Sequence, residues 1–84
     1  MYKVTTRSFK AEKQFYEYLN DKVSKKLELL KINPRKYLDA HKLKGKLEGL
    51  WSCWLGGDIR MIYEIDDLNK EIIVVAVGSH KIYL

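Results

Sequence analysis

The last third of the chain contains a nearly unbroken run of β-branched residues, from Glu71 to Val77, and this run constrains the fold most strongly. A run of this kind is typical of a central strand of a sheet. Ahead of it, residues 59–66 alternate between an apolar set and a mostly polar set, as in a strand with one better-buried face. Residues 66–69 and Gly56-Gly57 are predicted hairpin connections. Because residues 47–55 have little helical character, we predict three antiparallel strands in this half.

The first half of the chain predicts helices. Residues 2–6 alternate as a short strand does, and Ser8 is placed to cap a helix after it. Apolar residues then recur at helical spacing up to Leu30. The stretch forms either one long helix or a hairpin that bends at Asn20-Asp21, where an N-cap can start the second helix. We expect the hairpin, because two short helices cover a small sheet better than one rod about 36 Å long. Asn33-Pro34 ends the helical region, since the residue before proline avoids the α conformation.

Together these elements predict a single α+β domain over residues 1–84. It has a short N-terminal strand, a helical hairpin, and a three-stranded antiparallel sheet packed on the helices. The chain has one cysteine, Cys53, so no internal disulfide forms and the hydrophobic core must hold the fold. No apolar run approaches the ~20 residues of a membrane span, and residues 1–7 have no signal-peptide core. We therefore expect a cytoplasmic protein without a membrane partner.

Charge is divided unevenly along the chain. Residues 1–46 carry thirteen Lys and Arg against five Asp and Glu, a balance of +8. Residues 47–84 carry three against six, a balance of −3. A cationic surface attracts polyanions, because each Lys or Arg placed on a phosphate releases a condensed counterion. The pattern makes nucleic acid a candidate partner. The simpler interpretation, that the basic residues only keep the helices soluble, stays open.

Few residues in the chain can carry chemistry. His80 follows Gly78-Ser79 where the last predicted strand ends, and His41 lies in the predicted loop between the helices and the sheet. Asp58 opens a strand, and Arg60 lies two residues on, so the two share a face. Antiparallel topology can bring these positions to one edge. RNA cleavage needs such a set: a base for the ribose 2′-hydroxyl, an acid for the departing 5′-oxygen, and a cation for the phosphorane. Histidine suits the proton transfers, and the planar fork of arginine suits the phosphorane.

Metal, thiol and nucleotide chemistry fit the sequence less well. Two histidines and an aspartate can in principle bind zinc, but none of the usual short ligand spacings is present, so we expect no metal and no cofactor. Cys53 lies between Ser52 and Trp54 in an apparent strand, where a buried structural thiol is commoner than a nucleophile. There is no glycine-rich phosphate loop, so nucleotide hydrolysis is not supported.

Three lysines alternate just before the sheet, at Lys42, Lys44 and Lys46. If this stretch is extended, all three point the same way and form an edge that can follow a phosphate backbone. Tyr83 is less needed by the core and can stack on a base or orient a phosphate, whereas Trp51 is expected in the core. The predicted RNA-binding residues are therefore these three lysines and Tyr83.

Four segments of the second half together resemble a known family. They are HKLKG at residues 41–45, GLWS at 49–52, GDIRMIYEI at 57–65 and VGSH at 77–80. This ordered set resembles the RelE/ParE toxin superfamily and, within it, the YafQ-like messenger-RNA interferases. The resemblance implies a RelE-like fold and a toxin of a type II toxin–antitoxin system, an endoribonuclease that cuts mRNA in the ribosomal A site without a metal ion. It also implies a small acidic antitoxin as partner, besides mRNA and the ribosome.

The resemblance extends to individual positions. In YafQ-like enzymes the histidine of the terminal G-S/T-H, the aspartate of the strand-opening pair and the histidine of H-x-L-x-G are active-site residues, matching His80, Asp58 and His41. Arg60 matches the arginine that RelE-like members place against the scissile phosphate, and Tyr83 resembles their near-terminal tyrosine. We expect His80 to act as general acid, with Asp58 or His41 as base.

One departure from the family pattern leaves several functions open. Trp54 stands where a further family histidine is expected, so the division between acid and base is not assigned. A toxin that binds its antitoxin but has lost activity also stays possible. The same holds for a ParE-like toxin, which uses the same fold to poison DNA gyrase without needing His41 or His80, and for a non-catalytic RNA-binding module.

Overall fold

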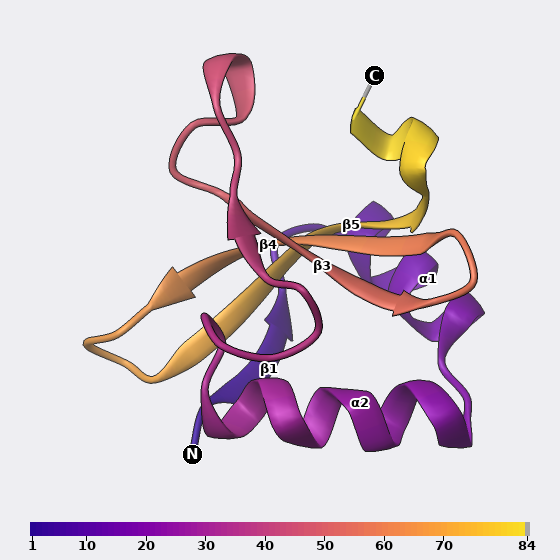
Figure 1. Cartoon of the computed structure of the whole chain (residues 1–84), viewed down its shortest axis with the longest axis horizontal. Coiled ribbons are helices and arrows are strands. Elements are labelled where there is room, and N and C mark those ends of the chain that lie inside the picture. Colours follow the sequence, from indigo (N-terminus) through magenta and orange to yellow (C-terminus); the bar gives the residue numbers. More distant parts are fainter. Residues whose placement is uncertain (84) are drawn as a thin grey trace.

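The computed structural model describes residues 1–83, except for the side chain of His80. In chain order its elements are β1 (Lys3–Thr6), α1 (Phe9–Tyr18), α2 (Asp21–Ile32), β2 (His41–Lys42), the short 3-10 helix η1 (Gly45–Leu47), β3 (Trp51–Gly56), β4 (Ile59–Asp66), β5 (Glu71–Ser79) and a second 3-10 helix, η2 (His80–Tyr83). The strands form a five-stranded sheet in the order β1-β5-β4-β3-β2. Both helices pack against one face of this sheet (Figure 1).

The predicted α+β class is confirmed, but the sheet is larger than the predicted three strands. β1 joins it by parallel pairing with β5, in a register that sets Lys3 opposite Glu71. His41 and Lys42 form a two-residue edge strand, β2, where the sequence predicts a loop. A strand of two residues such as β2 is too short to show an alternating pattern. The parallel pairing of β1 with β5 joins segments far apart in the sequence, so it has no local signal either.

The predicted helical hairpin is confirmed, with α1 and α2 as separate helices. Ser8 Oγ accepts a hydrogen bond from the Ala11 N–H at 3.1 Å. Asn20 Oδ1 accepts one from the Val23 N–H at 2.9 Å. Both expected N-caps therefore satisfy amides that the first turn of a helix leaves unpaired. No helix among residues 1–83 is long and apolar enough to cross a membrane.

The core lies between the helices and the sheet. Leu27 of α2 packs with Met61 and Tyr63 of β4 and Ile72 of β5, and each is at most 4% exposed. The Tyr63 hydroxyl donates a hydrogen bond to the carbonyl of Pro34 at 2.6 Å. This bond ties the segment that follows α2 to the centre of the sheet.

The predicted better-buried face of β4 is confirmed, because Ile59, Met61, Tyr63 and Ile65 all pack in or against the core, but the centre of the strand is buried on its other face as well. Met61, Ile62 and Tyr63 are each at most 2% exposed. Met61 and Tyr63 belong to the core under the helices. Ile62 alternates with them and faces the other way, where η2 lies against β4 and β5.

A bulge in β5 determines which residues at the end of this strand face the core and which face the other way. Neighbouring residues of β4 pair with Ala76 and Val74, so Val75 is an extra residue in β5. Val74 faces the core before the bulge and Val77 faces it afterwards. Gly78 consequently lies on the face turned away from the helices.

Candidate active site

The sheet face turned away from the helices, which we call the open face, carries two of the predicted catalytic residues. Directly opposed residues of neighbouring strands share a face. His41 of β2 is opposite Ser52 of β3, which is opposite Ile62 of β4. Arg60 lies two residues before Ile62 and therefore also faces this side. His41 and Arg60 are thus two strands and two residues apart, which corresponds to about 12 Å between their Cα atoms.

Asp58 and His80 come to the same end of the sheet. Ile59, the first residue of β4, is paired with Ser79, the last residue of β5. Asp58 directly precedes this pair in the exposed β3–β4 turn, and His80 directly follows it as the first residue of η2. The side chain of His80 lies outside the described residues. The backbone therefore gathers Asp58, Arg60 and His80 at one strand end, with His41 further across the sheet.

His41 is held by a tight turn of the preceding chain. The Ala40 N–H donates to the Tyr37 carbonyl at 3.1 Å, and the two residues between them, Leu38 and Asp39, have φ values of 59° and 55°. Two consecutive non-glycine residues in the left-handed region are unusual and store backbone strain. His41 Nδ1 lies 2.9 Å from the Asp39 carbonyl oxygen. Because a carbonyl only accepts, Nδ1 carries the proton and Nε2 is left as the basic atom of the neutral ring.

Arg60 and Trp54 are cross-strand neighbours. The Arg60 guanidinium is half-buried, and its contact with the Ile59 carbonyl is a long one of 3.5 Å. The ion pairs found among residues 1–83 involve other basic side chains, so Arg60 has no carboxylate partner there. The Trp54 indole N–H donates to the Gly57 carbonyl at 2.8 Å, which closes the turn that carries Asp58.

Tyr83, predicted to contact RNA, is anchored to the sheet. Its hydroxyl shares a hydrogen bond with Ser52 Oγ, and Ser52 is fully buried. Ser52 is not predictable from the sequence, because a serine at an alternating strand position is indistinguishable from one that faces solvent. The spacing of 31 residues between the two partners gives no local signal.

The three predicted lysines do not form the extended edge expected from the sequence. The chain turns into η1 after Lys44, and Lys46 lies inside that helix. Lys42 directly follows His41 in β2 and so points to the opposite face. There its ammonium lies 5.9 Å from the centre of the Trp51 ring, which packs against the core as expected.

A hollow of about 590 Å³ adjoins this tryptophan and gathers positive charge. Its lining includes Arg35, Lys42, Lys44 and Trp51, together with one carboxylate, Glu48. The Arg35 guanidinium lies 5.7 Å from the centre of the Trp51 ring. Lys42 and Lys44 are therefore together on the helix side of β2, behind His41 rather than beside it.

Neither a metal cluster nor a reactive thiol is evident in the described part of the chain. Within it, no group of three His, Cys, Asp or Glu side chains is placed to hold a metal ion. Cys53 is buried, as the sequence predicts, and burial raises the pKa of its thiol to about 12. A thiol with this pKa stays protonated at neutral pH and is a poor nucleophile.

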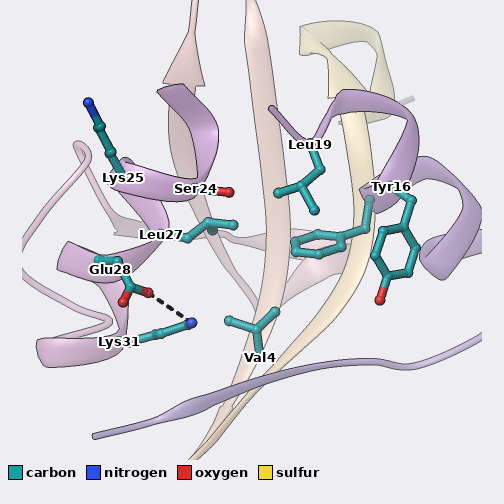
Figure 2. Close-up of a pocket in the computed structure, with 9 residues that line it drawn as sticks. Val4, Tyr16, Leu19, Ser24, Lys25, Leu27, Glu28 and Lys31 are labelled. Atoms are coloured by element: carbon teal, nitrogen blue, oxygen red, sulfur yellow. Dashed lines mark ion pairs between the residues drawn. The ribbon is translucent and has the colours of Figure 1, made fainter. Parts of the chain in front are cut away.

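A second hollow lies between the two helices and the edge strand β1 (Figure 2). It measures about 410 Å³, and apolar side chains such as Val4, Leu19 and Leu27 form its floor. Lys25 and Lys31 stand at its rim, the latter paired with Glu28 at 2.8 Å. We call this hollow the helical groove.

Comparison with known proteins agrees with the resemblance found in the sequence. The model of a family described as a bacterial toxin of type II toxin–antitoxin system, YafQ, matches residues 2–83. No curated protein matches the chain in sequence.

Three solved structures are similar over nearly the whole chain. A metal-bound toxin from Helicobacter pylori is 25% identical, with a TM-score of 0.73 and coverage of 100% of both chains. YafQ from E. coli is 17% identical, with a TM-score of 0.70 and coverage of 100% of this chain and 99% of that one. A YoeB–YefM toxin–antitoxin complex from Staphylococcus aureus is 24% identical, with a TM-score of 0.67 and coverage of 95% and 98%. The last two similarities concern the fold.

Proposed function

Because this chain belongs to the YafQ family of bacterial toxins of type II toxin–antitoxin systems, we propose that it is a cytoplasmic endoribonuclease that cleaves mRNA on the ribosome without a metal ion. The observation that carries the proposal is the strand pairing. It sets His41 and Arg60 on one open face and ends β5 directly before His80, beside the turn of Asp58. Imidazole, carboxyl and guanidinium groups supply the acid, base and cation that RNA cleavage needs.

In the proposed reaction the ribose 2′-hydroxyl attacks the adjacent phosphate and leaves a 2′,3′-cyclic phosphate. His80 is the general acid for the departing 5′-oxygen, and Asp58 or His41 is the base. For His41, the bond of Nδ1 to the Asp39 carbonyl makes Nε2 the atom that takes the proton. Arg60 pairs with two oxygens of the phosphorane through its planar fork.

The test maps RNA 3′ ends on translating ribosomes treated with the purified protein. We expect cleavage by protein that has been stripped of metal with EDTA and transferred to the Mg²⁺ buffer that ribosomes need. His80→Ala should slow this cleavage by about 10²–10⁴-fold, the usual effect of losing a general acid. Leu68→Ala is the matched control, because Leu68 is 91% exposed in the β4–β5 turn, at the other end of the sheet. Cleavage by His80→Ala at the normal rate would contradict the catalytic assignment. Gyrase-dependent DNA breaks with intact mRNA would instead favour a ParE-like toxin.

Binding of RNA is proposed for the basic residues around the β2 edge. Lys42 and Lys44, which line the hollow beside Trp51, and Lys46 in η1 hold backbone phosphates. Tyr83 completes the contact from the open face, where its ring stacks on a base or its hydroxyl orients a phosphate. The strand His41–Lys42 is then contacted from both faces, since its two side chains point in opposite directions.

A cognate antitoxin is the expected protein partner, as in the toxin–antitoxin complex of the staphylococcal relative. For this chain we place an acidic amphipathic antitoxin segment in the helical groove. Apolar side chains of such a segment cover the groove floor, and its carboxylates meet Lys25 and Lys31 at the rim (Figure 2).

The groove offers a matched pair of variants. Tyr16 lines it and is 64% exposed, whereas Phe9, 85% exposed on the same helix, lies outside its lining. We expect Tyr16→Asp to weaken antitoxin binding at least about tenfold in calorimetric titration and Phe9→Asp to leave it unchanged, because central contacts carry most interface energy. If the two variants bound the antitoxin with equal affinity, the helical groove would not be its binding site.

A further inference from the structure

The turn η2 is seated on the open face by a buried hydrogen bond. Ser52 is fully buried, and its hydroxyl shares a hydrogen bond with that of Tyr83, the last residue of η2. A buried hydroxyl in the middle of a sheet needs a partner, and here the partner comes from the end of the described chain. The bond therefore fixes the far end of η2 above β3.

Gly78 allows η2 to lie close to β5. A Cβ atom at Gly78 would stand 2.7 Å from Ile82 Cγ2, nearer than such atoms approach in proteins. The φ of Gly78 is not positive, so space rather than backbone conformation requires the glycine. Gly78 is also the cross-strand neighbour of Arg60, which places this close contact beside a proposed catalytic group.

Burial of Ile62 shows that η2 is a packed part of the fold. Ile62 faces away from the helices, yet it is only 2% exposed. It lies opposite Ser52, the hydrogen-bond partner of Tyr83, and η2 is in contact with β4. The turn is thus held by one hydrogen bond and by close packing against β4 and β5.

These contacts hold the segment that begins with His80, the first residue of η2. The backbone of His80 is joined to β5 through Ser79, which is paired with Ile59, and η2 is held at its other end by Tyr83. We propose that Ser52 and Gly78 are positioning residues: neither contacts RNA, and together they hold η2 on the sheet and so fix where the backbone of His80 lies in the site. This inference rests on the proposed function, in which His80 is the general acid.

The first arm of the test separates positioning from stability. Ser52→Ala and Gly78→Ala should each lower the single-turnover cleavage rate on ribosomes by about 10- to 100-fold, because displacing a catalytic group by about 1 Å has effects of this size. The substrate concentration for half-maximal rate should stay within about twofold, since the lysines proposed to hold backbone phosphates at the β2 edge are untouched. Both variants should also shift the imidazole NMR signals of His80.

The second arm is a rescue. Ile82→Leu removes Cγ2 while keeping the side-chain volume, so Gly78→Ala/Ile82→Leu should recover most of the rate that Gly78→Ala loses. Ser52→Ala/Tyr83→Phe should be no slower than Tyr83→Phe alone, because both changes remove the same hydrogen bond. Ser24→Ala, an exposed serine of α2, is the control for Ser52→Ala.

Three results would overturn the inference: an unchanged rate and unchanged His80 signals in Ser52→Ala, a Gly78→Ala defect that Ile82→Leu leaves in place, or a loss confined to substrate affinity. Failure of the proposed function has a different signature. His80→Ala then cleaves at the wild-type rate, while the NMR signals of His80 in wild type and in Gly78→Ala still report whether the turn is seated.

Discussion

Neighbouring side chains of one strand have different tasks in this protein. Met61 and Tyr63 of β4 point into the core, whereas Arg60 and Ile62 face the open side. Tyr63 adds a hydrogen bond to the core, and Arg60 presents to the open face a guanidinium that pairs with no carboxylate of residues 1–83. A substitution at one of these positions should therefore affect either stability or cleavage, and the two are separable.

The first prediction concerns Tyr63. Tyr63→Phe removes the hydroxyl that donates to the Pro34 carbonyl at 2.6 Å and leaves that buried acceptor without its partner. We expect a loss of about 1–3 kcal/mol in the free energy of unfolding, measured by urea denaturation. Tyr16→Phe, at an exposed position, should stay within about 0.5 kcal/mol of wild type.

Arg60 provides the second prediction. Arg60→Gln should slow cleavage by about 10²–10³-fold, as the loss of a group that stabilises developing charge does elsewhere. Arg60→Lys should recover only part of the rate, because an ammonium lacks the planar fork. The control is Arg7→Gln, since Arg7 is paired with Glu64 at 2.9 Å and its charge is already balanced. Equal rates for wild type and Arg60→Gln would exclude a role for this guanidinium.

The third prediction is a pH dependence of stability at Asp67. Its carboxylate accepts two hydrogen bonds from Arg35, at 3.0 and 2.7 Å, and one from Tyr2, and these hold its pKa at about 2, below the ordinary 3.8. The folded form thus binds the proton less readily than the unfolded chain. The contribution to stability is complete above about pH 4 and is lost as the pH falls towards about 2.

Asp67→Asn isolates this contribution. The difference in urea midpoint between wild type and Asp67→Asn should be largest near neutral pH and should shrink as the pH falls from about 4 to about 2. A difference that stayed constant over this range would show that the carboxylate does not act through its charge.

At the scale of elements, each helix begins at a residue whose side chain is identifiable in the sequence. Ser8 and Asn20 cap α1 and α2 through bonds to amides three residues on. Capping depends on four consecutive residues, which is why the break of the helical hairpin was predictable. The edge strand β2 is the opposite case, because its existence depends on pairing with β3 alone.

The caps supply the fourth prediction. Ser8→Ala and Asn20→Ala should each lower the free energy of unfolding by about 1 kcal/mol, since each leaves an amide of a first turn unpaired. Ser24→Ala, at the exposed fourth residue of α2, should change it by less than about 0.5 kcal/mol or stabilise slightly. Chemical denaturation of the three variants side by side is the measurement, and equal losses would discount the caps.

Over the whole molecule, charge and shape are arranged around the two edges of the sheet. β2 lies at one edge, with the basic hollow beside it, and β1 lies at the other edge, next to the helical groove. The two proposed partners, RNA and antitoxin, therefore meet the molecule at opposite edges.

The fifth prediction follows from this separation. In the His80→Ala background, the affinity for single-stranded RNA should fall with salt, and Lys42→Gln/Lys44→Gln should reduce the log–log slope by about 1.4, or about 0.7 per phosphate contact. Lys3→Gln/Lys70→Gln removes the same charge beside β1, at the opposite edge, and should leave the slope nearly unchanged. Equal slopes for the two double variants would mean that binding responds to net charge rather than to the β2 edge.

The sequence alone determined the parts of this protein whose signals are local. Strand alternation, the turns at Gly57 and Asp66, the caps and the apolar core positions all depend on residues a few places apart, and the structure agrees with them. The family motifs predicted the toxin assignment in the same way, because each is a short run of adjacent residues.

Only the tertiary structure decided which of these residues face one another. β1 pairs in parallel with β5, and Ser52 bonds to Tyr83, so each contact joins segments far apart in the sequence. Lys42 points away from His41 because the pairing of β2 with β3 makes that segment a strand. The periodicity of one segment gives no information about the segment that it contacts. A strand pattern specifies two faces but not what covers them. Which face stays open therefore depends on where the helices and η2 pack against the sheet, and this packing involves the whole chain.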